Sequence, residues 1–187
     1  LLLLDEPLAA LDKKLREHTQ FELMSIQERT GVTFIVVTHD QEEAMTLADR
    51  IAVMDKGEVK QIGSPTEIYE FPNSRFVAGF IGSVNSFEAT VIGREKPHLR
   101  LSVPGLGGEV LARDVLTAVE GQKVTLAVRP EKILLGKERS ASANSFQGQV
   151  KDLAYFGKDS LYRVALPDAL VQAHAVNARR GDEGARV

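Results

Sequence analysis

Short apolar runs and a segment of helical spacing alternate at the start of the chain. Leu1–Leu4 and Val32–Val37 are runs of apolar and β-branched residues, a pattern typical of strands covered on both faces of a parallel sheet. Between them, Asp12 is a candidate helix N-cap, and Gly31 can end the helix in the left-handed conformation. The positions at near-helical spacing inside this helix are Leu15, Thr19, Leu23 and Ile26. Strand, helix and strand in this order predict a βαβ unit.

Cap and turn residues define the elements that follow, up to residue 82. Asp40 and Glu43 fit a capping box, which predicts a short helix that runs through Ala48. Lys56-Gly57 fits the turn of a hairpin. The elements predicted after Ala48 are a hairpin of Arg50–Asp55 with Glu58–Ile62, a helix that starts at Ser64-Pro65-Thr66-Glu67, and a helix over Ser74–Ile81.

The pattern changes after Gly82, where short alternating or β-rich segments are separated by Gly, Pro and Asn. Strands at this spacing are typical of a small barrel or sandwich. Ser140–Ser145 (SASANS) is expected to be a loop between two halves of this region. The predicted strands are Phe87–Ile92, Leu99–Val103, Val124–Val128, Ile133–Leu135, Gln147–Leu153, Leu161–Leu166 and Leu170–Ala175.

Composition fits a globular protein of one or two domains, with a change of charge near Gly82. The chain has 187 residues, of which 43% are hydrophobic and 26% charged. It contains no cysteine, which excludes disulfides and cysteine-ligated metal sites. Residues 1–82 contain 8 Lys/Arg and 14 Asp/Glu, whereas residues 83–187 contain 15 and 12. We therefore expect an α/β domain over 1–82 and an all-β domain over 83–187, and the net charge of −3 does not indicate a nucleic-acid binder.

Two carboxylates and a histidine are the candidates for chemistry. Asp5 and Glu6 follow the first apolar run, and His39 follows the second. Parallel neighbours in a βαβ unit end at the same sheet edge, where α/β folds bind ligands, so the three side chains are expected to lie close together. An Asp there can hold Mg²⁺ at a nucleotide's phosphates, and a Glu beside it can accept a proton from water. The alternatives are an ordinary polar strand end for Asp5-Glu6 and a helix-capping or solvated histidine for His39.

Longer motifs around these residues resemble those of a known family. LLLLDEPLAALD, from Leu1 to Asp12, resembles the Walker B motif and D-loop of ATP-binding-cassette (ABC) ATPases. VTHDQEEAMTLADRIAVMDKGEVKQIGSPTEIYEFP resembles their switch-histidine region and its continuation in importers. The resemblance implies a P-loop NTPase fold, with Asp5 binding Mg²⁺ through water, Glu6 as catalytic base and His39 contacting the γ-phosphate of ATP. It places Asp12 in the loop that crosses to the partner ATPase, besides its possible N-cap role.

The second part of the chain extends the resemblance. FVAGFIGSVNSFEATV is similar to the junction between the ATPase domain and a C-terminal TOBE domain, which has oligonucleotide-binding-type folds, in importers of polyamines, maltose and related solutes. IGSVN, VRPEKI and VKDLAYFGKDSLYRV together most resemble the putrescine/spermidine group, with sugar, iron or sulfate importers as alternatives. In this second part, Arg129 and Lys132 are expected to lie on a solvated β surface, with a basic patch as the alternative.

Three family motifs are absent from this sequence: the GxxxxGK[ST] P-loop, the Gln loop and the LSGGQ-like signature. We therefore expect an N-terminal portion to be missing and the TOBE domain to be cut short at its end. The resemblance implies a homodimer of ATPase subunits, membrane-spanning permease partners, indirect contact with a solute-binding protein, no nucleic acid, and a position at the cytoplasmic side of the membrane.

Two other functions remain open. The chain could act only as a regulatory or dimerisation module without ATPase activity, or it could derive from an ABC-type ATPase of DNA repair or chromosome maintenance, which shares the Asp-Glu pair. If strands that neighbour Leu1–Leu4 are absent, we also expect exposed apolar surface and self-association of the isolated chain.

Overall fold

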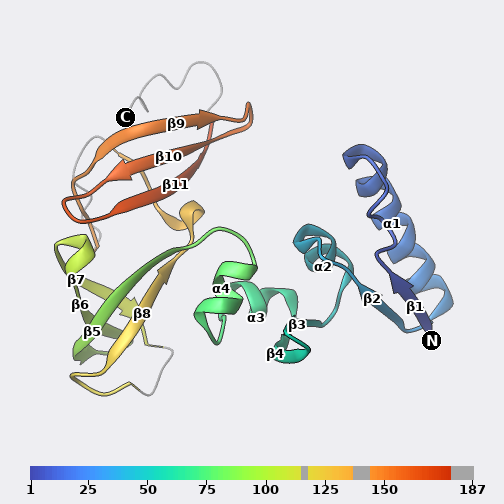
Figure 1. Cartoon of the computed structure of the whole chain (residues 1–187), viewed down its shortest axis with the longest axis horizontal. Helices are drawn as coiled ribbons and strands as arrows, with labels where there is room; N and C mark the ends of the chain where they lie inside the picture. Colours follow the sequence, from blue (N-terminus) through green and yellow to red (C-terminus); the bar gives the residue numbers. More distant parts are fainter. Residues whose placement is uncertain (115–117, 137–143, 178–187) are drawn as a thin grey trace. The chain divides into compact units, whose positions relative to one another are not determined.

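The computed structural model describes residues 1–114, 118–136 and 144–177. The chain forms two compact units, Leu1–Gly82 and Ser83–Val187. The first unit is mixed α/β and the second is built of antiparallel strands (Figure 1). Both characters match the fold class that the hydropathy pattern predicts.

The first unit opens with the predicted βαβ arrangement. β1 (Leu2–Asp5) pairs in parallel with β2 (Phe34–Val37), and α1 (Lys13–Thr30) connects them. The Asp12 side chain accepts a hydrogen bond of 3.0 Å from the Leu15 amide, which caps α1 at its start. Gly31 ends α1 with φ 62°, a conformation that glycine adopts without steric cost.

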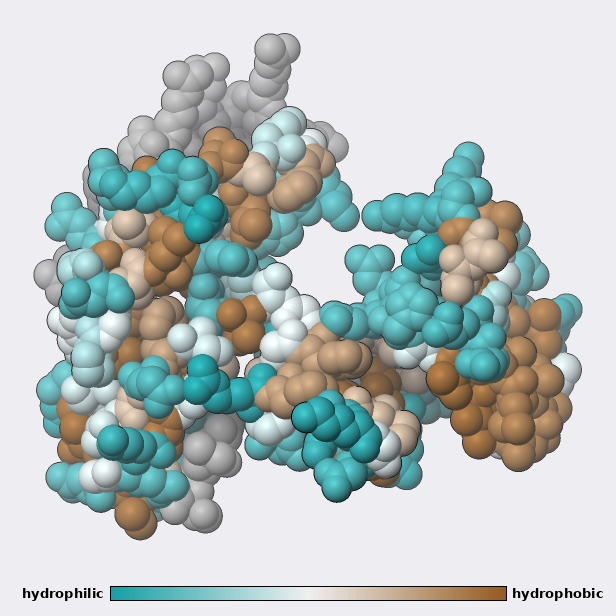
Figure 2. All heavy atoms as spheres, viewed as in Figure 1, coloured by the Kyte–Doolittle hydropathy of each residue, from teal (hydrophilic) through white to brown (hydrophobic). Residues whose placement is uncertain are grey.

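One face of the β1–β2 sheet is apolar and uncovered. The register pairs Leu3 with Ile35 and Asp5 with Val37, so Leu1, Leu3, Ile35 and Val37 lie on the same side. These four side chains are 78%, 67%, 51% and 58% exposed, and we call them the apolar sheet face. Figure 2 shows brown side chains gathered over this end of the first unit. The expectation that both faces are covered is thus wrong for this chain, and the expected exposed apolar surface is confirmed.

The rest of the first unit has its own small core. It comprises α2 (Gln41–Leu47), β3 (Ile51–Asp55), β4 (Glu58–Gly63), α3 (Pro65–Glu70) and α4 (Arg75–Phe80). β3 and β4 form the predicted hairpin, whose turn residues Lys56 and Gly57 have φ 51° and 80°. Hairpin and helices bury a common apolar cluster made of Ile51, Val53, Ile68, Val77 and Ile81.

The helix α3 starts at Ser64, as predicted, and its start is a complete capping box. The Glu67 amide donates to Ser64 Oγ over 3.3 Å, and Glu67 Oε2 accepts from the Ser64 amide over 2.8 Å. The backbone hydrogen bond from Ser64, followed by its hydroxyl, lowers the pKa of the Glu67 carboxyl.

The second unit contains a four-stranded antiparallel sheet in the order β7-β6-β5-β8. Its strands are β5 (Asn85–Glu95), β6 (His98–Val103), β7 (Gly108–Arg113) and β8 (Lys123–Val128), with a 3-10 turn, η1 (Pro104–Leu106), between β6 and β7. The core residues lie on one face of this sheet and include Val91, Leu99, Leu101 and Val103, each at most 3% exposed. β7 has no counterpart among the predicted strands.

A three-stranded antiparallel sheet, β11-β10-β9, completes the described part of the second unit. Its strands are β9 (Gln149–Tyr155), β10 (Asp159–Ala165) and β11 (Leu170–Val176). The Asn85 side chain joins the two sheets, since Nδ2 donates to the Gln172 carbonyl and Oδ1 accepts from the Gln172 amide, both over 2.8 Å. Asn85 is only 7% exposed, so these hydrogen bonds are shielded from water.

Two predictions for the second unit are wrong. Ile133–Leu135 is not a strand: it follows the 3-10 turn η2 (Pro130–Lys132), and Leu134 is 94% exposed. Arg129 does not lie on a solvated surface: it is buried, and its Nη1 donates to the Ser83 carbonyl over 3.2 Å. The predicted loop Ser140–Ser145 falls mostly outside the described residues.

Candidate functional site

The carboxyl ends of β1 and β2 lie side by side. The Glu6 amide donates to the Val37 carbonyl over 2.8 Å, which extends the parallel ladder by one residue beyond Asp5. This pairing brings Asp5 and Glu6 to the same edge as Thr38 and His39. The sequence prediction that both polar segments meet at one sheet edge is confirmed.

Glu6 and His39 are in direct contact at this edge. His39 Nδ1 lies 2.9 Å from Glu6 Oε1, so a proton on Nδ1 makes a hydrogen bond to the carboxylate. The side chains are 73% exposed for His39 and 49% for Glu6, so both face solvent. The hydrogen bond to Glu6 and the charge of Glu6 raise the pKa of His39, with smaller contributions from the charges of Asp40 and Glu43. A carboxylate paired with an imidazole can accept or hold a proton near neutral pH.

Glu6 adopts an unusual backbone conformation. Its φ is 46°, in the left-handed region that non-glycine residues seldom occupy. The chain then turns sharply, with hydrogen bonds from the Ala9 amide to the Glu6 carbonyl at 3.3 Å and from the Leu11 amide to the Leu8 carbonyl at 3.1 Å. Leu8 is 2% exposed and anchors this turn. The turn directs the Glu6 side chain toward His39 instead of along the strand.

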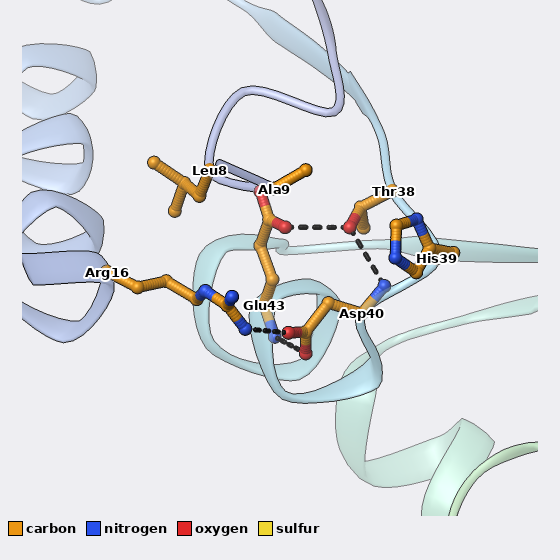
Figure 3. Close-up of a pocket in the computed structure, with 7 residues that line it drawn as sticks. All are labelled: Leu8, Ala9, Arg16, Thr38, His39, Asp40 and Glu43. Atoms are coloured by element: carbon orange, nitrogen blue, oxygen red, sulfur yellow. Dashed lines mark hydrogen bonds and ion pairs between the residues drawn. The ribbon is translucent and has the colours of Figure 1, made fainter. Parts of the chain in front are cut away.

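A hydrogen-bonded network holds the residues on either side of His39 (Figure 3). The Thr38 hydroxyl donates to Glu43 Oε2 over 2.7 Å and accepts from the Asp40 amide over 3.0 Å. Asp40 Oδ1 accepts from the amides of Glu42 and Glu43 and so caps α2. Asp40 is therefore the predicted N-cap, but the capping box is incomplete, because the Glu43 carboxylate bonds to Thr38 instead of the Asp40 amide.

Arg16 joins this network from α1. Its Nη1 lies 2.7 Å from Asp40 Oδ2, and its Nη2 donates to the Leu11 carbonyl over 3.0 Å. The sequence analysis did not identify Arg16, Thr38 or Glu43 as site residues. The available indication was position: Thr38 and Asp40 flank His39, and Arg16 lies one helical turn after the N-cap of α1.

A small cavity lies beneath His39, lined by Leu8, Ala9, Arg16, Thr38, His39, Asp40 and Glu43 (Figure 3). Glu43 is 2% exposed, and its Oε1 has no hydrogen-bond partner within the protein. The polar lining and the unpaired oxygen suit a bound water molecule.

Asp5 and Asp12 are placed differently from Glu6 and His39. Asp5 ends β1 with an exposed side chain next to Glu6. Asp12 lies at the start of α1, with its carboxylate engaged by the Leu15 amide. The structure thus brings Glu6 and His39 into contact, places Asp5 at the same edge and shows Asp12 in the N-cap role.

Within residues 1–114, 118–136 and 144–177, no three or more His, Asp or Glu side chains are arranged to hold a metal ion. This does not conflict with a magnesium role for Asp5, because Mg²⁺ is commonly held by one or two carboxylates, waters and substrate phosphates. None of the described helices is long and apolar enough to cross a membrane.

Comparison with known proteins yields one matching family model. Residues 126–187 match the model of the TOBE domain. The match covers β9, β10 and β11 and begins within β8.

Curated relatives cover nearly the whole chain. It is 48% identical over 186 residues to the "Putrescine transport ATP-binding protein PotG" of Escherichia coli (strain K12), which covers 98% of this chain and 49% of that protein. It is 49% identical over 168 residues to the "Spermidine/putrescine import ATP-binding protein PotA" of Pseudomonas aeruginosa (strain UCBPP-PA14), with 89% and 46% covered. The protein of that name from Nitrosospira multiformis is 45% identical over 184 residues, with 97% and 50% covered. The chain spans about half the length of these relatives and corresponds to their C-terminal part.

Proposed function

Because this chain is similar over nearly all of its length to the C-terminal part of polyamine-import ATP-binding proteins, we propose that the whole protein is the ATP-hydrolysing subunit of an ABC importer. We propose putrescine or spermidine as the transported solute, since the relatives' names specify these polyamines. The observation that supports the ATPase reading most directly is the contact between Glu6 and His39 at the carboxyl edge of two parallel strands.

In this proposal Glu6 is the catalytic base and His39 the γ-phosphate sensor. Glu6 Oε1 is held by His39, which leaves the second carboxylate oxygen to accept a proton from the attacking water. The raised pKa of His39 favours the protonated imidazole, which can donate a hydrogen bond to a phosphate oxygen.

Asp5 and Asp12 support the same reaction. Asp5, at the strand end beside Glu6, would hold Mg²⁺ through water, and the metal would neutralise developing charge on the phosphates. Asp12 would lie in the loop that faces a second copy of the subunit across the nucleotide. Its N-cap hydrogen bond to Leu15 fixes the base of that loop.

The assembly follows from the same proposal. Two ATPase subunits would bind MgATP between them, and their closure would drive permease subunits that receive solute from a binding protein. The protein would then lie at the cytoplasmic side of the membrane. This 187-residue chain alone, which lacks a P-loop motif, would bind nucleotide weakly and would not hydrolyse it.

Substitution of Glu6 by Gln in the full-length protein tests the proposed function. Loss of the general base is expected to lower ATP turnover by roughly 10²- to 10⁴-fold while nucleotide binding persists. Glu28→Gln, an exposed change on the same α1 connection, is the matched control and should hydrolyse ATP normally. Near-normal turnover in Glu6→Gln would remove the role assigned to Glu6.

A second experiment separates the ATPase reading from a purely regulatory module. Calorimetric titration of the 187-residue chain with MgATP should show little binding, because the residues that grip phosphates are not in this sequence. Micromolar binding would contradict this expectation.

Uptake measurements test the solute. Cells that lack the full-length protein should lose labelled putrescine or spermidine uptake and keep sugar, iron and sulfate uptake. The opposite result would assign the subunit to another importer.

A further inference from the structure

Arg16 connects two loops that both belong to the site. Its guanidinium donates from Nη2 to the Leu11 carbonyl, in the turn that follows Glu6, and pairs through Nη1 with Asp40, directly after His39. The distances are 3.0 Å and 2.7 Å. The flat, forked guanidinium can make both contacts at once, which a lysine ammonium on a flexible chain reproduces poorly.

Asp40 links the Arg16 contacts to His39, because Asp40 directly follows His39 in the chain. Its Oδ1 caps α2 through two amides while its Oδ2 faces Arg16, so both carboxylate oxygens are engaged. On the other side of His39, Thr38 is fixed by the buried carboxylate of Glu43 and by the Asp40 amide. His39 is itself 73% exposed, so apart from its contact with Glu6 its position depends on these two neighbours.

We propose that Arg16 is a positioning residue that ties the loop of residues 6–12 to the loop that carries His39. A movement of the 6–12 loop would then be transmitted through the Leu11 carbonyl, Arg16 and Asp40 to the histidine. This inference rests on the proposed ATPase function, because it concerns the alignment of Glu6 with His39. It goes beyond that function by assigning a role to a residue on α1 that contacts neither.

A stability role alone accounts poorly for this arrangement. Arg16 and Asp40 are 32% and 26% exposed, and partly exposed ion pairs contribute little to folding. Both helices are also capped independently, α1 by Asp12 and Gly31 and α2 by Asp40 Oδ1. The distinctive feature of Arg16 is that it reaches two loops far apart in sequence, which is what alignment of a shared site requires.

The test uses ATP hydrolysis by the full-length protein with Arg16→Met, Asp40→Asn and the double variant. Asp40→Asn is informative because asparagine caps helices as well as aspartate, so it removes the ion pair and keeps the cap. We expect each single variant to lower kcat about tenfold with KM for ATP changed less than about twofold, as small misalignments at a site do. The double variant should be no slower than the singles, since both break the same connection.

Arg29→Met, in the last turn of α1, is the matched control and should retain normal kcat. Selective ¹⁵N-histidine labelling of the same variants adds a readout besides activity. The Nδ1 resonance of His39, assigned with His39→Gln, should shift in Arg16→Met and in Glu6→Gln and should not shift in Arg29→Met.

The outcomes separate the two proposals. If Glu6→Gln abolishes turnover while Arg16→Met and Asp40→Asn match Arg29→Met in kcat, and Arg16→Met also matches it in the His39 resonance, the positioning role is wrong and the ATPase function stands. If Glu6→Gln leaves turnover intact while the His39 resonance moves in Arg16→Met, the connection exists and the proposed function fails. If Arg16→Met does not fold, the kcat of Asp40→Asn alone decides, because the loss of the Asp40 charge shifts the His39 resonance by itself.

Discussion

The β1–β2 sheet and the four-stranded sheet of the second unit use apolar residues in opposite ways. In β1–β2, Leu3 and Ile35 on the outer face are 67% and 51% exposed. In β6, Leu99 and Leu101 are both 3% exposed, while His98 and Arg100, which alternate with them, are exposed. The strands of the first sheet are more apolar, yet the apolar residues of the second sheet are more deeply buried.

The difference lies in the period of the pattern. An alternating strand needs cover on one side only, and β5–β8 supply it from within the unit. A continuous apolar strand needs cover on both sides, and its parallel partner does not provide it. Apolar content alone therefore does not identify a stable region, whereas its period does.

The largest loss of unfolding free energy should come from a substitution in the core of the second unit. Leu101→Ala removes a buried side chain from a closely packed cluster and is expected to cost about 3 kcal/mol of unfolding free energy. Leu3→Ala, on the apolar sheet face, should cost less than about 0.5 kcal/mol. Urea unfolding followed by circular dichroism measures both, and equal losses would break the comparison.

The next largest loss of unfolding free energy should come from removing the Asn85 hydrogen bonds that connect the two sheets of the second unit. Asn85→Ala leaves the Gln172 amide and carbonyl without their partners and is expected to cost about 2 kcal/mol. Asn73→Ala in the first unit removes an exposed bond to the Lys60 carbonyl and should cost clearly less in the same urea unfolding experiment. A cost for Asn73→Ala that matches that of Asn85→Ala would show that burial does not set the value of these bonds.

The apolar sheet face is expected to cause self-association of the chain, and substitutions on this face should reduce it. Leu3→Lys with Ile35→Glu introduces opposite charges at paired positions, so the strands can still pair while the face becomes polar. Sedimentation should show less association than for the unchanged chain. Leu134→Lys with Val176→Glu, at isolated exposed positions of the second unit, is the control. An equal decrease in the control would show that the sheet face is not the cause.

The smallest expected effect is a pH dependence of folding stability that arises from His39 at the edge of the β1–β2 sheet. Because Glu6 raises the pKa of His39, protonation of His39 favours the folded state. This contribution is complete below the ordinary histidine pKa near 6.5 and is lost as pH rises through the raised folded value. NMR titration should show a lower His39 pKa in Glu6→Gln and an unchanged one in Glu28→Gln. An unchanged His39 pKa in Glu6→Gln would mean that the contact does not persist in solution.

Local features of the fold were predictable from the sequence. The caps at Asp12, Gly31 and Ser64 depend on residues within one helical turn, so the sequence contains all the information. The meeting of Glu6 and His39 was predictable for another reason: parallel topology brings strand ends together whatever the intervening length.

Features decided by tertiary partners were not predictable. The ion pair of Arg16 with Asp40 depends on how α1 and α2 pack. β7 has a glycine, a glutamate and an alanine, which favour strands weakly, and it becomes a strand by pairing with β6. Ile133–Leu135 shows the converse, since an apolar segment without a partner strand forms none.

Because Glu6 has a left-handed backbone, selection for folding and selection for function are expected to favour different residues at position 6. A library of all residues at position 6, screened only for soluble expression, should favour glycine and asparagine, which adopt φ 46° at lower cost. The same library, screened in the full-length protein for growth on the proposed polyamine, should favour glutamate. The difference in residue preference between the two screens would show how much backbone strain is retained at position 6 because function requires the carboxylate.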